Sequence, residues 1–447
     1  MTNDNTPERT SPEKQLSEGN VAESKSETRL EENFAEESIA PVGVETPEEP
    51  SQEEKKPETI PETEDENVVD KLEKSETNEA VAADSSASDD SQIHVCVTGA
   101  SGFVASHCIY QLLQNPNYIV HATVRNASDT NKYGWILDLA QTEEAKQRIK
   151  LFSADLNKPN SFDEAIEGCR FVLHVASPYS MTVKDPQKNL VEPAVNGTRT
   201  VLESALKAGV QRVVLTSSFA AICDEPVKGH VYTEEDWNEK SSLKRLPYYY
   251  SKVLAEREAW KIVEENKGKI ELLTINPHVV LGKSFSSALN ESPKIVADVA
   301  NGKFPFLIAI TFTFVDVEDV AKAHILAMET TNPDAVNQRY LCSEGTTVEL
   351  KMLVEAMKQS LPKHKLPTTD MTGGFGSGLI KMMSYAQPSA VGSFLRNHIS
   401  KPVEVDNSKS RRLLGLEYKP WAVSVKDTVE SLQKWGYISV DGKKVKI

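Results

Sequence analysis

The chain has 447 residues, and its formal charge of −16 is concentrated at one end. Met1–Ser91 holds 27 acidic and 8 basic residues, a net charge of −19, whereas Gln92–Ile447 holds 39 acidic and 42 basic residues, a net charge of +3. A nearly neutral region gives no electrostatic reason to expect nucleic acid as a partner, because such proteins depend on a basic surface.

The acidic end is also poor in apolar residues. Met1–Ser91 is rich in Glu, Ser, Pro and Thr, and Phe34 is its only aromatic residue. Such a segment cannot bury enough apolar surface to offset the entropy that is lost on ordering. We therefore expect a disordered acidic tail over residues 1–91. Two roles fit this composition, a solvated spacer and a regulatory segment that docks on another, unidentified protein.

Signals for export, membrane insertion and metal binding are missing from the sequence. It shows no apolar h-region and no Arg-rich transit peptide, and no apolar run approaches the ~18 residues that span a bilayer. The cysteines are odd in number, without C-x-x-C or metal-ligand spacing. They are Cys96, Cys108, Cys169, Cys223 and Cys342. We expect buried free thiols in a reducing compartment, no metal, no membrane contact and a cytoplasmic location.

From Ile93 onward, short apolar runs alternate with helical patterns. The predicted strands cover residues 93–98, 118–124, 151–153, 171–176, 213–216 and 270–275. The predicted helices cover about 103–114, 133–146, 161–167, 189–208 and 248–266. This alternation predicts an α/β fold with a doubly wound parallel sheet of the Rossmann type, covered by helices on both faces.

The pattern divides the chain into three parts. Residues 1–91 form the tail, 92–282 a dinucleotide-binding Rossmann domain, and 283–447 a smaller, mainly substrate-binding part with some elements that return to the Rossmann core. In the third part we expect a strand followed by a helix over 314–328 and a last helix near 424–435. The Gly-containing run Met371–Gly378 is predicted to be a flexible loop near the substrate mouth.

The first predicted strand runs into a glycine-containing turn, Thr98-Gly-Ala-Ser-Gly-Phe-Val-Ala105. Gly99 permits a tight turn, Gly102 lets the backbone approach a pyrophosphate, and Ala105 is small where helix meets strand. Ser101, Phe103 and Val104 complete the predicted phosphate-binding loop. An ordinary strand-to-helix turn is the alternative.

The residues after the second predicted strand indicate which dinucleotide is bound. NAD-binding proteins usually carry Asp or Glu there to hold the ribose hydroxyls, but Arg125 stands at this place and the first acid is Asp129. A guanidinium suits the 2′-phosphate of NADPH, and Lys132 supplies a second positive charge. The alternative is a solvated loop arginine.

Tyr248 and Lys252 are predicted to lie one turn apart on the same face of a helix. An ammonium group beside a phenol favours the phenolate and lowers a pKa that is ordinarily about 10. Ser218 follows the fifth predicted strand, where a hydroxyl can donate to a carbonyl oxygen that gains charge. Tyr249 and Tyr250 are neighbouring tyrosines, but neither has a lysine four residues on.

These motifs resemble those of the extended short-chain dehydrogenase/reductases, within the NAD-dependent epimerase/dehydratase superfamily. The similarity is to the branch of dihydroflavonol reductases, cinnamoyl-CoA reductases and fungal methylglyoxal/aldehyde reductases, and it covers about Ile93 to Ile438. The matching stretches, in family order, are VTGASGFVASH, ATVRN, ADL, HVASP, PAVNGT, RVVLTSS, YTEEDWN, YYYSKVLAE, INPHVVLG, FVDVEDVAKAH and DNSKSRRLLG.

The resemblance implies a role for each matching residue. Ser218, Tyr248 and Lys252 match the family's catalytic triad, and Asn196 matches an asparagine with a mainly structural role. The positions implied beside the cofactor are Asp155, Leu156, Val175, Ala176, Ser177, Pro277, Val280 and Ser292, together with Tyr248 and Lys252. Lys283 departs from the family, which has proline there, and we expect it to alter the rim of the nicotinamide pocket.

The sequence therefore predicts an NADP-dependent oxidoreductase that reduces a small-molecule aldehyde or ketone with NADPH. Two alternatives stay open. One is a nucleotide-sugar epimerase or dehydratase with tightly held NAD, against which Arg125 and the HVASP stretch argue. The other is a non-catalytic dinucleotide sensor, against which the retained Tyr248 and Lys252 argue.

Overall fold

The computed structural model of the chain describes residues 92–178, 183–387 and 389–447. Seven strands form one sheet in the order β12-β7-β5-β4-β1-β2-β3, and every neighbouring pair is parallel. The strands are β1 (Ile93–Val97), β2 (Tyr118–Val124), β3 (Ile149–Ser153), β4 (Phe171–His174), β5 (Arg212–Thr216), β7 (Glu271–Pro277) and β12 (Arg339–Cys342). The predicted doubly wound parallel sheet is confirmed.

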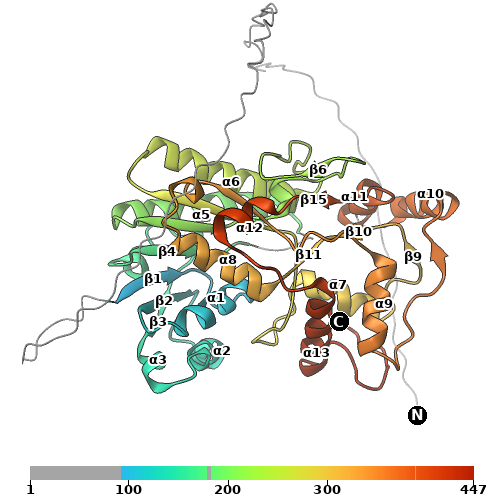
Figure 1. Cartoon of the computed structure of the whole chain (residues 1–447), viewed down its shortest axis with the longest axis horizontal. Coiled ribbons are helices and arrows are strands. Elements are labelled where there is room, and N and C mark those ends of the chain that lie inside the picture. Colours follow the sequence, from blue (N-terminus) through green and yellow to red (C-terminus); the bar gives the residue numbers. More distant parts are fainter. Residues whose placement is uncertain (1–91, 179–182, 388) are drawn as a thin grey trace, which may run out of the picture. The chain divides into compact units, whose positions relative to one another are not determined.

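Helices cover both faces of this sheet (Figure 1). One face carries α1 (Phe103–Leu113) and α8 (Val317–Glu329), and the other carries α4 (Asp163–Ile166), α5 (Glu192–Lys207) and α6 (Pro247–Glu265). Alternation along β1 divides the core, because Val95 and Val97 join the cluster with α1 and α8, whereas Cys96 joins the cluster with α5 and α6.

The predicted helix over residues 133–146 is wrong. Three short elements stand there, α2 (Thr130–Tyr133), η1 (Gly134–Leu139) and α3 (Glu143–Gln147). The chain is extended at Ala140, and the side chain of Thr142 then accepts from the N–H of Ala145, which starts a new helix. The predicted helix at 161–167 is likewise shortened to α4.

The residues after β7 build a second apolar cluster around α7 (Glu291–Ala300), α9 (Leu350–Ser360) and α13 (Trp421–Lys434). Four pairs of short strands accompany it: β6 (Val231–Tyr232) with β15 (Glu404–Val405), β8 (Val279–Leu281) with β11 (Phe314–Asp316), β9 (Leu307–Ile308) with β14 (Asp370–Met371), and β10 (Thr311–Phe312) with β13 (Val348–Glu349). The other short elements are η2 (Gln187–Val191), η3 (Phe219–Ala221), η4 (Pro333–Ala335) and α12 (Ser408–Leu414).

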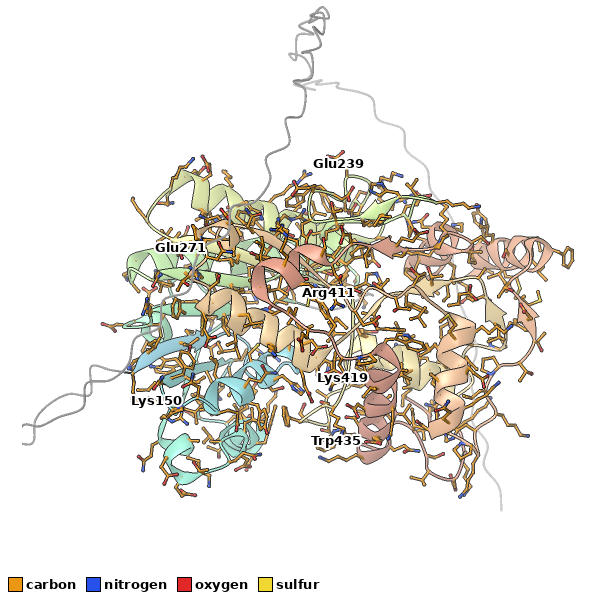
Figure 2. All side chains as sticks on the ribbon, viewed as in Figure 1. Lys150, Glu239, Glu271, Arg411, Lys419 and Trp435 are labelled. Carbon is orange, nitrogen blue, oxygen red and sulfur yellow. The ribbon has the colours of Figure 1, made fainter. Side chains whose placement is uncertain are left out.

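Lys419 connects this part to the helices on the sheet. Its ammonium lies 3.2 Å from Asp316 and 3.0 Å from Glu318 at the start of α8, and 3.4 Å from Asp427 in α13. Figure 2 labels Lys419 beside one end of α13 and Trp435 near the other. The ion pairs therefore fix the start of α13 against α8.

The Gly-containing run is helical from Gly374, so the loop predicted over 371–378 is wrong. The helices here are α10 (Gly374–Met383), η5 (Ser384–Ala386) and α11 (Ser389–His398). A Cβ at Gly376 would lie 2.5 Å from the carbonyl oxygen of Met371. Glycine is therefore used here for the close approach of two backbone segments, which outweighs its low helix propensity.

The predicted acidic tail, residues 1–91, lies outside the described residues. Among the residues that the structure does describe, no helix combines the length and the apolar composition needed to cross a lipid bilayer.

A buried histidine predicts how stability depends on pH. His324 in α8 is fully buried, its Nδ1 donates to the Val320 carbonyl at 2.7 Å, and its Nε2 lies 2.6 Å from the Thr216 hydroxyl, from which it accepts. Burial lowers the pKa of His324 to about 4 from the ordinary 6.5. The fold thus favours the neutral imidazole, so its stabilisation is present above pH 6.5 and is lost as pH falls toward 4.

We expect His324→Gln to flatten this dependence. Between pH 7 and pH 5 the free energy of unfolding should fall by roughly 2 kcal/mol less in His324→Gln than in the unmodified protein, as measured by urea titration. His230→Gln, which alters an exposed histidine, is the control. Equal pH slopes in all three proteins would contradict this linkage.

Candidate functional site

The carboxyl ends of β1 and β4 are joined by one threonine side chain. Thr98 Oγ1 accepts from the N–H groups of Val175 and Ala176, at 3.0 and 2.9 Å. It also lies 2.9 Å from His174 Nδ1, to which the hydroxyl hydrogen can be donated. Burial lowers the pKa of His174 to about 3, so this imidazole is neutral and can accept. These hydrogen bonds therefore fix the carboxyl ends of β1 and β4 relative to each other.

The glycine-containing loop is seated in the resulting corner. Gly99 has a φ of +69°, and a Cβ there would lie 2.9 Å from the Ala176 Cβ. Its N–H donates to Thr123 Oγ1 at 3.1 Å, and the N–H of Ala100 donates to the Thr123 carbonyl at 2.8 Å. The loop thus lies against the ends of both β2 and β4, with backbone where a side chain would not fit.

The first turn of α1 follows this loop. Gly102 is exposed and extended at the N-cap position, where it offers no side chain to the first N–H groups of the helix. Ser101, Phe103 and Val104 are half-buried around it, whereas Ala105 is fully buried against the sheet. Uncapped N–H groups and the positive end of the helix dipole suit an anion such as a pyrophosphate.

Arg125 and Lys132 are both exposed near the end of β2. Arg125 is the first residue after that strand, and Lys132 lies in α2 with its ammonium 5.3 Å from the Tyr133 ring. After β3, the Asp155 carboxylate accepts from the N–H of Asn157 at 2.9 Å, and Leu156 packs against α5 at Gly197. All four residues sit at the carboxyl edge or in the loop that follows it.

Lys252 is buried beside Tyr248 in the first turns of α6. Its ammonium donates to Ser177 Oγ at 3.0 Å and lies 6.0 Å from the centre of the Tyr248 ring. Burial lowers the pKa of Lys252 to about 8, and the charge of Glu256 opposes that change. The lysine is therefore still mostly charged at neutral pH, although it is almost out of contact with solvent.

Ser218 lies just beyond β5, in a turn that packs against α6. It is half-buried, and its Oγ accepts from the N–H of Ala220 at 3.1 Å. Its carbonyl accepts from Asn276 Nδ2 at 3.3 Å. Since parallel strands end on one edge, the fold brings Ser218 to the edge that carries Ser177 and Lys252.

The other predicted positions are more widely spread. Pro277 is the buried last residue of β7, Val280 is buried in β8, and Ser292 is half-buried in the first turn of α7. Asn196 is exposed on α5, where its Oδ1 accepts from Arg199 at 3.3 Å.

Lys283, which was predicted to alter the rim of a nicotinamide pocket, lies next to α13, and its effect on that rim stays a prediction. Its ammonium pairs with Asp427 at 3.3 Å and with Glu430 at 3.7 Å, so it turns toward α13. Two carboxylates within reach on a neighbouring helix explain this orientation, because they offer the ammonium a better partner than the strand end does.

Several residues that organise this edge were missed by sequence reasoning. Thr98 and Thr123 hold the glycine loop, and Asn276 and Glu256 hold the turn of Ser218. The available signals were a hydroxyl residue at each strand end and a glutamate one turn after Lys252. Neither signal identifies a partner on another strand.

Known proteins share both the sequence and this architecture. Residues 96–368 match the model of the 3-beta hydroxysteroid dehydrogenase/isomerase family. Cinnamoyl-CoA reductase CAD2 of Medicago truncatula is 36% identical over 346 residues, which cover 76% of this chain and 95% of that protein. Dihydroflavonol 4-reductase of Dianthus caryophyllus is 34% identical over 280 residues, which cover 61% and 75%.

A solved structure extends the comparison to the fold. Yeast methylglyoxal/isovaleraldehyde reductase Gre2, complexed with NADPH, superposes with a TM-score of 0.62 and 28% identity over 77% of this chain and 100% of that one. The chain therefore belongs to the 3-beta hydroxysteroid dehydrogenase/isomerase family, in the branch of cinnamoyl-CoA, dihydroflavonol and Gre2-type reductases that its motifs resemble.

The close approach at Gly99 can be separated from its backbone conformation. Gly209 has the same φ of +69°, but a Cβ there meets nothing within 4 Å. Gly209→Ala should cost roughly 1–2 kcal/mol of unfolding free energy for the left-handed conformation alone. Gly99→Ala should cost about 1–3 kcal/mol more, because Ala176 must also move. Urea unfolding measures both, and equal losses would show that contact with Ala176 is unimportant.

Proposed function

We propose that this protein reduces an aldehyde or ketone with NADPH, with Tyr248 as the proton donor. The observation that carries the proposal is the buried ammonium of Lys252, which lies beside the Tyr248 ring and donates to Ser177. Support comes from the relatives, which are named as reductases, and from Gre2, whose structure was solved with NADPH.

The residues present fit a bound dinucleotide. Gly99 lets the loop lie against Ala176 more closely than a side chain would allow, and the N–H groups that open α1 have no side-chain cap. In the proposal these groups hold the pyrophosphate, and Arg125 binds the 2′-phosphate. Residues 175–177, Pro277 and Val280 would lie along the rest of the cofactor. NADPH, when bound, supplies the hydride.

The protein's own side chains then handle the carbonyl oxygen and a proton. Ser218 Oγ accepts from the Ala220 N–H, which leaves its hydrogen to donate to the carbonyl oxygen as negative charge develops. Tyr248 donates its phenolic proton to the alkoxide. Lys252, charged and poorly solvated, lies beside the ring and favours the phenolate that remains.

Two further assignments belong to this proposal. Residues 283–447, which form their own apolar cluster, would supply most of the substrate-binding surface next to a Rossmann domain of residues 92–282. The five cysteines of the chain are all buried and free, which favours a reducing compartment such as the cytoplasm.

The tyrosine variants test the chemistry directly. Tyr248→Phe should lower kcat by about 10²–10⁴-fold, because a positioned proton donor contributes on that order. Folding and NADPH binding should stay close to those of the unmodified protein, since the ring is kept. Tyr249→Phe is the matched control, as its ring neighbours Tyr248 without a lysine one turn on. Near-normal turnover in Tyr248→Phe, or no reduction of any carbonyl by the unmodified protein, would refute the proposal.

Coenzyme choice can be tested at Arg125. Arg125→Asp should weaken NADPH binding by about tenfold or more, because a charge-assisted phosphate contact is worth roughly 1.5–3 kcal/mol, and should spare NADH binding. Arg170→Asp makes the same charge change in an exposed arginine just before β4, at the opposite edge of the sheet. Fluorescence titration with both coenzymes measures the ratio, and a preference of the unmodified protein for NADH would overturn the assignment.

A further inference from the structure

A second charged group lies buried under the catalytic edge, one turn beyond Lys252. Glu256 of α6 is fully buried. Its Oε2 accepts from Ser217 Oγ at 2.5 Å and from Asn276 Nδ2 at 2.8 Å. Its Oε1 accepts from Arg339 Nε at 2.7 Å and from Trp260 Nε1 at 3.3 Å. The Thr274 hydroxyl also lies 3.2 Å from Oε1, so donors from five residues surround one carboxylate.

The partner of this carboxylate is equally enclosed. Only 9% of the Arg339 side chain is exposed, and its guanidinium stacks on Trp237 with its centre 3.8 Å from the ring centroid. A second nitrogen of the guanidinium donates to the carbonyls of Glu234 and Asp236. Removing an ion pair of this kind from water costs more than packing apolar side chains of the same volume. A gain in stability therefore does not account for the ion pair of Glu256 with Arg339. What the pair adds is a fixed orientation of the groups that it contacts.

Asn276 connects the ion pair to the turn that holds Ser218. The Glu256 carboxylate can only accept, so the amide nitrogen must face it, and Oδ1 then lies on the other side, 2.9 Å from the Thr274 hydroxyl. The two hydrogens of Nδ2 then go to Glu256 and to the carbonyl of Ser218. Every polar atom of the Asn276 side chain is used, and its orientation is set by its neighbours.

The network joins four elements at one place. Ser217 brings in β5 immediately before Ser218, Asn276 brings in β7, and Arg339 brings in β12 from 83 positions away in the chain. Glu256 itself is rigidly linked to Lys252, because both lie in α6 and one turn separates them. A displacement of the Glu256 carboxylate would therefore move Ser218 relative to Tyr248 and Lys252.

We propose that Glu256 is a positioning residue for the reduction. Held by Arg339, it fixes Ser218 through Asn276 and Ser217 at the distance from Tyr248 that the reaction requires. The proposal rests on the proposed function, since it assigns a role toward the same three side chains. It adds a buried ion pair to the groups on which turnover depends, although neither member of the pair touches substrate or cofactor.

The charge of Glu256 supplies a readout that a purely structural role would leave unchanged. The charged and titratable groups around Lys252 are Tyr248 and Glu256 on α6, His174 on β4 and, beyond Glu256, Arg339 on β12. Of these, Glu256 raises the pKa of Lys252 against the effect of burial. Neutralising Glu256 should thus lower that pKa, and Lys252 should lose its proton at a lower pH.

The opposite edge of the sheet provides a matched control. Arg212 and Glu271 form an ion pair across the same two strands, β5 and β7, with Nε 2.8 Å from Oε2, and Arg212 also donates to main-chain carbonyls. Both residues stand at the amino ends of their strands, away from Ser218, and Glu271 is labelled in Figure 2. Glu271→Gln likewise removes one carboxylate charge that pairs with an arginine, but it does so at the amino end of β7, away from Ser218.

The experiment compares Glu256→Gln, Glu271→Gln and Tyr248→Phe on the full chain with NADPH and a reducible aldehyde. Glu256→Gln should lower kcat by about tenfold to hundredfold, as expected for a misplaced catalytic group, with NADPH affinity within about twofold of the unmodified protein. The basic limb of its pH profile should move to lower pH. Glu271→Gln should keep both kcat and the pH profile, even if its melting temperature falls.

Each outcome bears on one of the two proposals. Unchanged kcat and pH profile in Glu256→Gln, with Tyr248→Phe inactive, would overturn the positioning role and leave the proposed function intact. An active Tyr248→Phe would instead overturn the proposed function and, with it, this role. If Glu256→Gln does not fold, Asn276→Ala decides, because it keeps the ion pair and removes the link to Ser218. Normal turnover in Asn276→Ala would overturn the positioning role.

Discussion

The burial of one ammonium group, that of Lys252, constrains most of the carboxyl edge of the sheet. A lysine that keeps its charge away from water needs close polar partners, since desolvation favours the neutral form. Lys252 finds them in the Ser177 hydroxyl, the face of the Tyr248 ring and the nearby charge of Glu256. The end of β4 must therefore lie against the start of α6, and the same arrangement places a phenol beside a cation. Giving the buried ammonium its polar partners and placing it beside the Tyr248 phenol therefore require the same geometry.

Two kinds of group meet at this edge, and they are specified differently. The loop after β1 presents backbone groups, so it requires residues with little or no side chain. Gly99 and small neighbours such as Ala176 meet this requirement. The turn after β5 presents side chains, so the orientation of those side chains must be fixed. Ser218, Asn276 and the ion pair of Glu256 with Arg339 meet this requirement. An anion can be held by N–H groups alone, whereas proton transfer needs a particular atom at a particular place.

The sequence predicts six of the seven strands of the sheet because mostly apolar runs mark them without knowledge of their neighbours, whereas β12, which begins with Arg339, was not predicted. The second strand was predicted with both of its ends, 118 and 124. The region from 130 to 147 was not, because a threonine cap inside the pattern restarts the helix. Within the site, a local motif indicated Tyr248 and Lys252. The partner of Glu256 is Arg339, 83 positions away in the chain. The partner of Lys283 is Asp427, on a helix near the C-terminus. Contacts between residues so far apart in the chain leave no signal in the local sequence.

The residues after β7 are attached to the sheet and to the loops after β5 by apolar packing as well as by polar contacts. They have their own apolar cluster, and two-residue strands such as the pair of β6 and β15 join them to the loops after β5. Phe219 and Tyr232 after β5 also pack with Val403 in one apolar cluster. Ion pairs add to this packing: Lys401 with Glu225 near α11, and Lys419 with the start of α8. Partly exposed ion pairs of this kind each contribute little, so the apolar contacts supply most of the attachment. The sheet and the elements that return to it after β7 therefore share one core, which holds the ends of the strands in place.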